Sequence, residues 1–342
     1  MVKNMKRFTA LLISSVLTLS VICFFMTGAK SQENAYIKYA EFNVTYNALK
    51  KALDADISSH DSNIKLSWTD ILAYLGAKYG GDFSKYRDSD MDNIIGQLKD
   101  GKDINTLTKD MKYFSYYKDV YSAVLDGLVG EYEEYSCNEN SEPVKTTKYG
   151  LKAYSPIAKG FAFSHFDDFG AVRTYGYTRE HLGHDMMCAV GTPIIAVEDG
   201  TVEAVGWNQY GGWRIGIRSH DKKRYYYYAH LRQNRPYHCD IKEGCEVHAG
   251  DVIGYAGRTG YSTKENVNNI EIPHLHFGIE LIFDESQKEC DNEIWIDLYT
   301  LTQLLETHKS DVRRNSETKE FFSLRQSGLL NSKIQVKKDP ES

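Results

Sequence analysis

The first half of the chain carries apolar residues at helical spacing. Residues 46–53, 68–75, 91–98 and 117–128 each place apolar side chains every three or four positions. This spacing is typical of amphipathic helices, which bury one face and expose the other. Glycine-containing breaks separate these segments. We therefore expect a helical domain over residues 30–136.

In the second half the apolar positions alternate with a period of two, which indicates short β-strands. Residues 193–198 and 201–207 flank Asp199-Gly200, which is a strong hairpin signal. Further strands are expected at residues 213–219, 223–230, 252–256 and 274–281, with a turn around Asp221. A closing helix is expected at residues 294–305. The pattern predicts the α+β class, in which a mostly antiparallel β domain over residues 161–306 follows the helical region.

Two segments lack a clear apolar period. Residues 137–160 are polar and are expected to form a linker, and the charged residues 307–342 are expected to be largely disordered. The net charge of −6 argues against a nucleic-acid partner, because phosphate binding relies on many Lys and Arg. The six cysteines have no CxxC spacing, which leaves zinc-finger and thioredoxin interpretations without support. Whether Cys239 and Cys245 pair stays open.

The N-terminus has the pattern of an export signal. Lys3, Lys6 and Arg7 precede an apolar run over residues 8–27, and such a positive flank stays on the cytoplasmic side. Residues 1–29 are therefore either a cleaved signal peptide or a retained membrane anchor, since about 20 apolar residues can span a bilayer. Either outcome places the rest of the chain outside the cytoplasm, secreted or held at the cytoplasmic membrane.

Histidines and a carboxylate recur in the β half. His274 and His276 lie two positions apart on an expected strand, so both side chains point to one face and can share a metal ion. His181 and Asp185 are four apart, and the glycine at position 183 favours an extended loop rather than a helix. His184 should point away from Asp185.

A further histidine ends a strand that is rich in tyrosine. Strict alternation places Tyr226, Tyr228 and His230 on one face of this strand. Two imidazoles and one carboxylate suit a zinc site with a vacant fourth position, which leaves two histidines for proton transfer. The residue types therefore point to a metallohydrolase.

The order of these motifs resembles the lysostaphin-like M23 peptidases, also called LytM-domain peptidoglycan endopeptidases. The resemblance covers residues 175–281, about a third of the chain. The segments that carry it are HLGHD at 181–185, GTP at 191–193, DGTV at 199–202, YAHL at 228–231, AGDVIG at 249–254, GRTG at 257–260 and PHLHF at 273–277. The resemblance implies a lysostaphin-like β domain that acts on peptidoglycan.

Within that resemblance, one zinc ion per chain is held by His181, Asp185 and His276. His230 and His274 match the catalytic histidines of the family. Tyr175 and Tyr228 are candidate oxyanion or substrate contacts.

The segment at residues 261–272 is longer than the family's usual connection, so it is expected to reshape one wall of the substrate groove. Cys188 stands where family members often have a small residue. One alternative is a non-hydrolytic envelope scaffold or activator that uses the helical half to bind an envelope protein. A biotinyl- or lipoyl-type carrier is disfavoured because the expected hairpin tip has no lysine. The peptide bond that is cleaved cannot be read from these motifs.

Overall fold

The computed structural model describes residues 36–139, 143–288 and 292–328. The predicted export segment and residues 329–342 lie outside this range. The chain divides into two compact units, Met1–Ile37 and Lys38–Ser342, and every element below belongs to the second unit. Within the described residues, no helix is both long and apolar enough to cross a membrane.

The helical region follows the predicted pattern. Its helices are α2 (Tyr46–Ser59), α3 (Trp68–Tyr79), α4 (Asp88–Lys99), α5 (Ile104–Thr108) and α6 (Phe114–Leu125), with a short 3₁₀ turn, η1 (Phe83–Lys85). The Ser67 side chain caps α3 by accepting from the Asp70 N–H, and Gly80 ends the helix in the left-handed conformation. Leu49, Ile71 and Val124 are fully buried between the helices.

A β-hairpin replaces the end of the expected helical region and part of the expected linker. Strands β1 (Val129–Cys137) and β2 (Pro143–Leu151) pair antiparallel over their whole length. The sequence prediction of helix up to residue 136, followed by a polar linker, is wrong for these residues. Lys145 pairs diagonally with Glu133 at 2.6 Å, whereas Tyr135 lies directly opposite Lys145, so polar and apolar residues are mixed on this face of the hairpin. The domain boundaries themselves stay a prediction.

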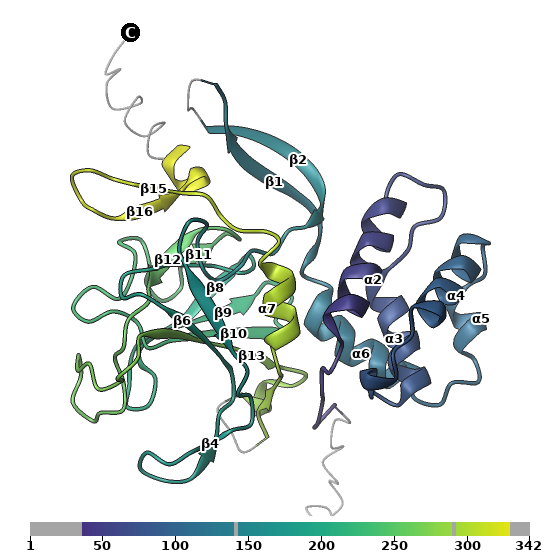
Figure 1. Cartoon of the computed structure of the whole chain (residues 1–342), viewed down its shortest axis with the longest axis horizontal. Helices are drawn as coiled ribbons and strands as arrows, with labels where there is room; N and C mark the ends of the chain where they lie inside the picture. The colour runs from purple at the N-terminus through teal and green to yellow at the C-terminus, as the bar shows by residue number, and fades with distance from the viewer. Residues whose placement is uncertain (1–35, 140–142, 289–291, 329–342) are drawn as a thin grey trace, which may run out of the picture. The chain divides into compact units, whose positions relative to one another are not determined.

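The centre of the β domain is an antiparallel sheet in the order β11-β8-β9-β10-β13-β6-β3, with β14 paired to β13 (Figure 1). The strands are β3 (Phe163–Phe166), β6 (His184–Cys188), β8 (Gly200–Asn208), β9 (Gly212–Ser219), β10 (Arg224–Ala229), β11 (Glu246–Val247), β13 (His274–Leu281) and β14 (Ile294–Trp295). Smaller two-stranded sheets are formed by β4 (Val172–Arg173) with β5 (Arg179–Glu180), and by β7 (Pro193–Ile195) with β12 (Val252–Tyr255). These strands confirm the α+β class and most of the predicted strand positions.

Two local predictions in this domain are wrong. The hairpin expected at Asp199-Gly200 does not form, because β7 pairs with β12 whereas β8 pairs with β9. Gly200 instead permits a close approach, since a Cβ there would lie 2.4 Å from the Arg218 carbonyl oxygen. The closing helix α7 (Tyr299–Leu305) starts later than expected, because Ile294–Trp295 extends the sheet as β14.

Buried contacts join the helical region to the β domain. The Arg224 guanidinium on β10 donates to both Glu198 carboxylate oxygens, at 2.9 and 3.0 Å, and to the Ala123 carbonyl of α6 at 2.6 Å. Gly127 makes room for this pair, since a Cβ there would lie 2.0 Å from Glu198 Oε1. Helix α7 lies beside α2, where the Thr300 hydroxyl donates to the Val44 carbonyl at 2.8 Å (Figure 1).

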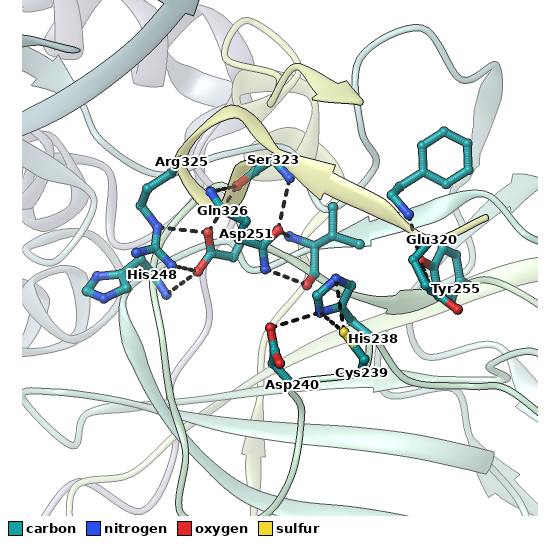
Figure 2. Close-up of polar contacts among 12 residues, drawn as sticks. His238, Cys239, Asp240, His248, Asp251, Tyr255, Glu320, Ser323, Arg325 and Gln326 are labelled. Atoms are coloured by element: carbon teal, nitrogen blue, oxygen red, sulfur yellow. Dashed lines mark hydrogen bonds and ion pairs between the residues drawn. The ribbon is translucent and has the colours of Figure 1, made fainter. Parts of the chain in front are cut away.

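Residues 307–328 are ordered, so the prediction of disorder over residues 307–342 is wrong for this part. Strands β15 (Val312–Arg314) and β16 (Phe321–Ser323) form a hairpin. Beyond it, Arg325 forms an ion pair with the buried Asp251, and the Ser323 hydroxyl donates to Asp251 Oδ1 at 3.1 Å (Figure 2). These contacts are made with a loop some 70 residues away in sequence, which a local charge pattern does not reveal.

Candidate active site

Three of the predicted residues meet at one point. His276 on β13 lies opposite Asp185 on β6 in the strand register, and His181 lies in the loop between β5 and β6. His181 Nε2 is 2.8 Å from His276 Nδ1, and both nitrogens are 3.1 Å from Asp185 Oδ1. These ligand atoms form a group that could hold a metal ion. The extended loop expected around His181 is confirmed.

A glycine that the sequence interpretation used only as a loop signal shapes this cluster. A Cβ on Gly183 would lie 2.5 Å from Cε1 and 2.6 Å from Nε2 of His276. Distances below 3.0 Å require something to move, so no other residue fits here without displacing the imidazole. The signal was present as the third position of the HLGHD segment, between His181 and Asp185.

Asp168 and Arg173 form a second layer that the sequence interpretation missed. His181 Nδ1 lies 3.1 Å from Asp168 Oδ1 and 3.3 Å from the Asp168 carbonyl oxygen. A proton on Nδ1 donated to the Asp168 carbonyl oxygen leaves the Nε2 lone pair facing the cluster, as metal-binding histidines require. Arg173 pairs with Asp168 and reaches within 3.7 Å of Asp185 Oδ2. No spacing motif connects Asp168 and Arg173 to the histidines, so only the fold reveals them.

The other two predicted histidines stand next to the cluster. The rings of His230 and His274 are 4.8 Å apart between centroids, and His274 Nε2 lies 3.7 Å from Asp185 Oδ1. His230 Nδ1 lies 2.9 Å from the Thr259 carbonyl, and His274 Nδ1 lies 2.8 Å from the Ile272 carbonyl. When each Nδ1 donates to its carbonyl, each Nε2 is left as an acceptor.

Burial favours the neutral form of two histidines in this site. It lowers the pKa of His230 well below its ordinary value, and the neighbouring His274 and His276 lower it further. Burial likewise lowers the pKa of His276, against the opposing effect of Asp185. For Asp185, burial alone would raise the pKa, but hydrogen bonds from His181 and His276 outweigh it and the net pKa is lowered. A carboxylate beside neutral imidazoles is the protonation state that binds a metal ion.

The prediction that Tyr226, Tyr228 and His230 share one face is wrong at His230. This residue follows the end of β10 with a left-handed φ of +60°, which breaks the alternation and turns its ring towards the cluster. Tyr228 is fully buried on the opposite face, where its hydroxyl accepts from the Val197 N–H at 3.1 Å. Tyr228 therefore does not reach the cluster as a substrate contact, whereas Tyr227 does line the adjoining cavity.

An open cavity of about 490 Å³ lies over the cluster. Its lining includes His181, Asp185, His230 and His276, together with Tyr210, Arg214, Tyr227 and Tyr261. Tyr175 is 40% exposed and packs on Tyr261, with centroids 5.0 Å apart, so it stands at one wall of the cavity without lining it. The long connection at residues 261–272 thus contributes to this wall through Tyr261. A substrate contact by Tyr175 stays a prediction.

The donor set fits zinc. Two imidazole nitrogens and one carboxylate oxygen are typical zinc ligands, and three protein ligands are typical of a catalytic site that keeps one position for water or substrate. The mutual distances of 2.8 to 3.1 Å bring the three donors close enough to share one ion. His184 faces away, as expected, and lies 2.7 Å from His165 through their ring nitrogens.

A second group of metal-ligand types lies in the region of Figure 2. His238, Cys239 and Asp240 are consecutive, with Cys239 Sγ 3.9 Å from the His238 ring nitrogens. The His238 ring is buried and packs edge-on against Phe322, which explains it as a core residue. Cys239 and Cys245 are both free, so no bridge joins them in the structure.

Comparison with known proteins agrees with the geometry. Residues 179–289, which contain the ligand cluster and both neighbouring histidines, match the description "Peptidase family M23". Residues 179–289 are therefore of the peptidase class. They form a lysostaphin-like domain of peptidase family M23.

Individual relatives match over longer stretches. An L-Ala--D-Glu endopeptidase of Bacillus subtilis (strain 168) is 32% identical over 191 residues, which cover 53% of this chain and 57% of that protein. The peptidoglycan DD-endopeptidase ShyC of Vibrio cholerae is 27% identical over 255 residues, covering 72% of this chain and 51% of that protein. The chain thus spans about half the length of these relatives.

A solved structure supports the fold over most of the chain. The lytM protein of Ruminococcus gnavus ATCC 29149 superposes with a TM-score of 0.52 at 20% identity, over 82% of this chain and 92% of that one. At this identity the similarity concerns the fold, helical region included.

Proposed function

We propose that this protein is a zinc metalloendopeptidase that hydrolyses peptide cross-links or stem peptides of bacterial peptidoglycan outside the cytoplasm. The observation that carries the proposal is the convergence of His181, Asp185 and His276 within 2.8 to 3.1 Å at an open cavity, which His230 also lines. His274 lies beside this group, with its ring centroid 4.8 Å from that of His230. The names of the relatives supply the substrate class.

His181 Nε2, Asp185 Oδ1 and His276 Nδ1 would hold the zinc ion. When bound, zinc would polarise the substrate carbonyl and lower the pKa of water, which makes water a nucleophile near neutral pH. Asp168 would keep His181 in the tautomer that binds metal. Gly183 would leave space for the His276 ring, and burial would keep the donors pre-organised.

His230 and His274 would move the proton. Each presents Nε2 as an acceptor, so one of them can take a proton from the attacking water and become a donor. The same histidine can then donate this new Nε2 proton to the developing oxyanion and on to the departing amine, while the Nε2 of the other accepts a hydrogen bond from the water and orients it. Because burial lowers the pKa of His230, this residue stays neutral, and ready to accept, below the usual range of histidine.

Digestion of purified peptidoglycan tests this function. Wild-type protein is expected to release muropeptides that mass spectrometry assigns to one type of broken amide bond. His230→Ala should bind zinc as well as wild type but lose roughly 100- to 10,000-fold in turnover, which is the usual contribution of one acid–base group. Protein that holds zinc and releases no fragments would instead favour the non-hydrolytic scaffold.

A further inference from the structure

One arginine in the active-site cavity has no protein acceptor. Arg214 on β9 lines the cavity together with Tyr227 and His276. Its Nε atom is buried, and among the described residues its side chain has neither a hydrogen-bond nor an ion-pair partner. An unpaired buried guanidinium nitrogen costs free energy, which a bound anion would offset.

The other cations of the cavity are already engaged. Arg173 pairs with Asp168. Arg179 donates to the Tyr175 carbonyl at 3.2 Å and lies over the Tyr210 ring, and Lys288 pairs with Glu203. Among the residues that the structure describes, Arg214 is therefore the cation of this cavity that has no hydrogen-bond or ion-pair partner.

Its position suits a residue close to the bond that is cleaved. Strand β10 separates β9 from β13, so the backbones at Arg214 and His276 are two strand spacings apart, about 10 Å. An extended peptide advances about 3.3 Å per residue. A substrate with its scissile bond at the cluster can thus place a side chain or terminus, up to three residues away, at Arg214.

The chemistry of the site selects one kind of group. A guanidinium binds a carboxylate through two parallel hydrogen bonds. Glu180, Glu280 and Glu293 also line the cavity, which disfavours a polyanion but not a single carboxylate. We infer that Arg214 binds a free carboxylate of the substrate peptide and makes the enzyme prefer acidic stem peptides over neutral bridges. This inference rests on the proposed peptidase function.

The test compares two forms of one substrate. Purified peptidoglycan is used as isolated, and after its free carboxylates have been converted to amides with ammonia and a carbodiimide. Wild type, Arg214→Gln, Arg214→Lys and the control Arg235→Gln are assayed on both, with thermal melting to verify folding. Arg235 is an exposed residue that does not line the cavity.

Wild type and Arg235→Gln should cleave the free-acid form roughly 10- to 100-fold faster than the amidated form, mainly through KM, because hydrogen bonds to charged groups have this strength. Arg214→Gln should cleave both forms at similar rates, and Arg214→Lys should retain part of the preference. Equal cleavage of both forms by wild type would overturn the inference while leaving the peptidase function intact. This comparison uses wild type alone, so it does not depend on whether a variant folds. Absence of any release by wild type would contradict the proposed function and the inference with it.

Discussion

His276 and Asp185 face each other across adjacent strands, with His276 Nδ1 and Asp185 Oδ1 3.1 Å apart. Two positions along β13, His274 points to the same face, but its Nε2 lies 3.7 Å from the same carboxylate oxygen and is not part of the tight cluster. The register of one strand pair thus gives the two histidines different environments, although they are nearly adjacent in sequence.

This difference predicts different effects of the same substitution. His276→Ala should abolish zinc binding, because it leaves only two of the three protein ligands. His274→Ala is the matched variant on the same strand, and it should retain one zinc per chain while losing turnover. Metal content after dialysis, measured by atomic absorption, distinguishes them. Full zinc occupancy in His276→Ala would show that another residue serves as the third ligand.

Which residues converge could be predicted from sequence because they belong to local motifs. His274 and His276 share a face through the two-residue period of a strand, and the period survives in the structure. His230 was assigned to the wrong face, because its left-handed φ cannot be read from the alternation of the preceding tyrosines. His230 nevertheless lies beside the cluster, with its ring centroid 4.8 Å from that of His274, and its catalytic role stays a prediction from the resemblance.

The elements that were mispredicted are those held by distant contacts. Strands β1 and β2 pair through their backbones but mix polar and apolar side chains on each face, so their sequence looks like a linker. Residues 307–328 are held by Arg325 and Gln326, which contact Asp251 and Val252. Asp168 and Arg173 were missed for the same reason, since no local spacing ties them to the histidines.

Gly183 offers a test of the packing around the cluster. Gly183→Ala would place a methyl group 2.5 Å from the His276 ring, so the imidazole must shift away from its partners. We expect zinc affinity to fall at least about tenfold, as when groups that orient metal ligands are changed. The cost in stability should be about 1 to 3 kcal/mol, the usual range for overpacking.

Gly96→Ala in α4 is the matched control, because nothing lies within 4 Å of a Cβ at that position. It should leave zinc affinity unchanged and raise stability slightly, since alanine favours a helix by about 1 kcal/mol over glycine. Isothermal titration with zinc and urea unfolding measure the two effects. Equal zinc affinity in Gly183→Ala and wild type would show that the His276 imidazole can shift without weakening zinc binding.

Burial of His238 predicts a dependence of stability on pH. Burial lowers the pKa of His238 below its ordinary value of 6.5, so the unfolded chain binds a proton that the folded protein excludes. The stabilisation is therefore present above pH 6.5 and is lost as the pH falls towards the folded-state pKa, by up to about 1.4 kcal/mol per pH unit. Urea unfolding at several pH values, with a chelator to remove metal, should show this slope.

His238→Gln removes the contribution of this histidine to the pH dependence of stability. Its stability should fall less steeply than that of wild type between pH 6.5 and 5, although it is lower at neutral pH because packing against Phe322 is disturbed. Parallel pH profiles for the two proteins would mean that His238 is not kept neutral by the fold.

The ion pair of Arg325 with Asp251 predicts that the C-terminal segment contributes to the stability of the β domain. Asp251 is 3% exposed and also accepts from the Ser323 hydroxyl, so removing the arginine leaves a buried carboxylate short of a charged partner. Arg325→Ala should therefore lower the free energy of unfolding by about 3 kcal/mol. It should also make the segment from residue 312 onward accessible to proteases in the native state.

The double variant Asp251→Asn with Arg325→Ala is the control for the single variant, because it removes both charges together. The double variant should be more stable than Arg325→Ala alone, since the carboxylate left unpaired is then gone. Urea unfolding gives the free energies, and mass spectrometry of limited digests locates the cleavage sites. If Arg325→Ala unfolds like wild type and resists cleavage after residue 312, the segment must be held mainly by the burial of Phe322 and Leu324 rather than by the ion pair.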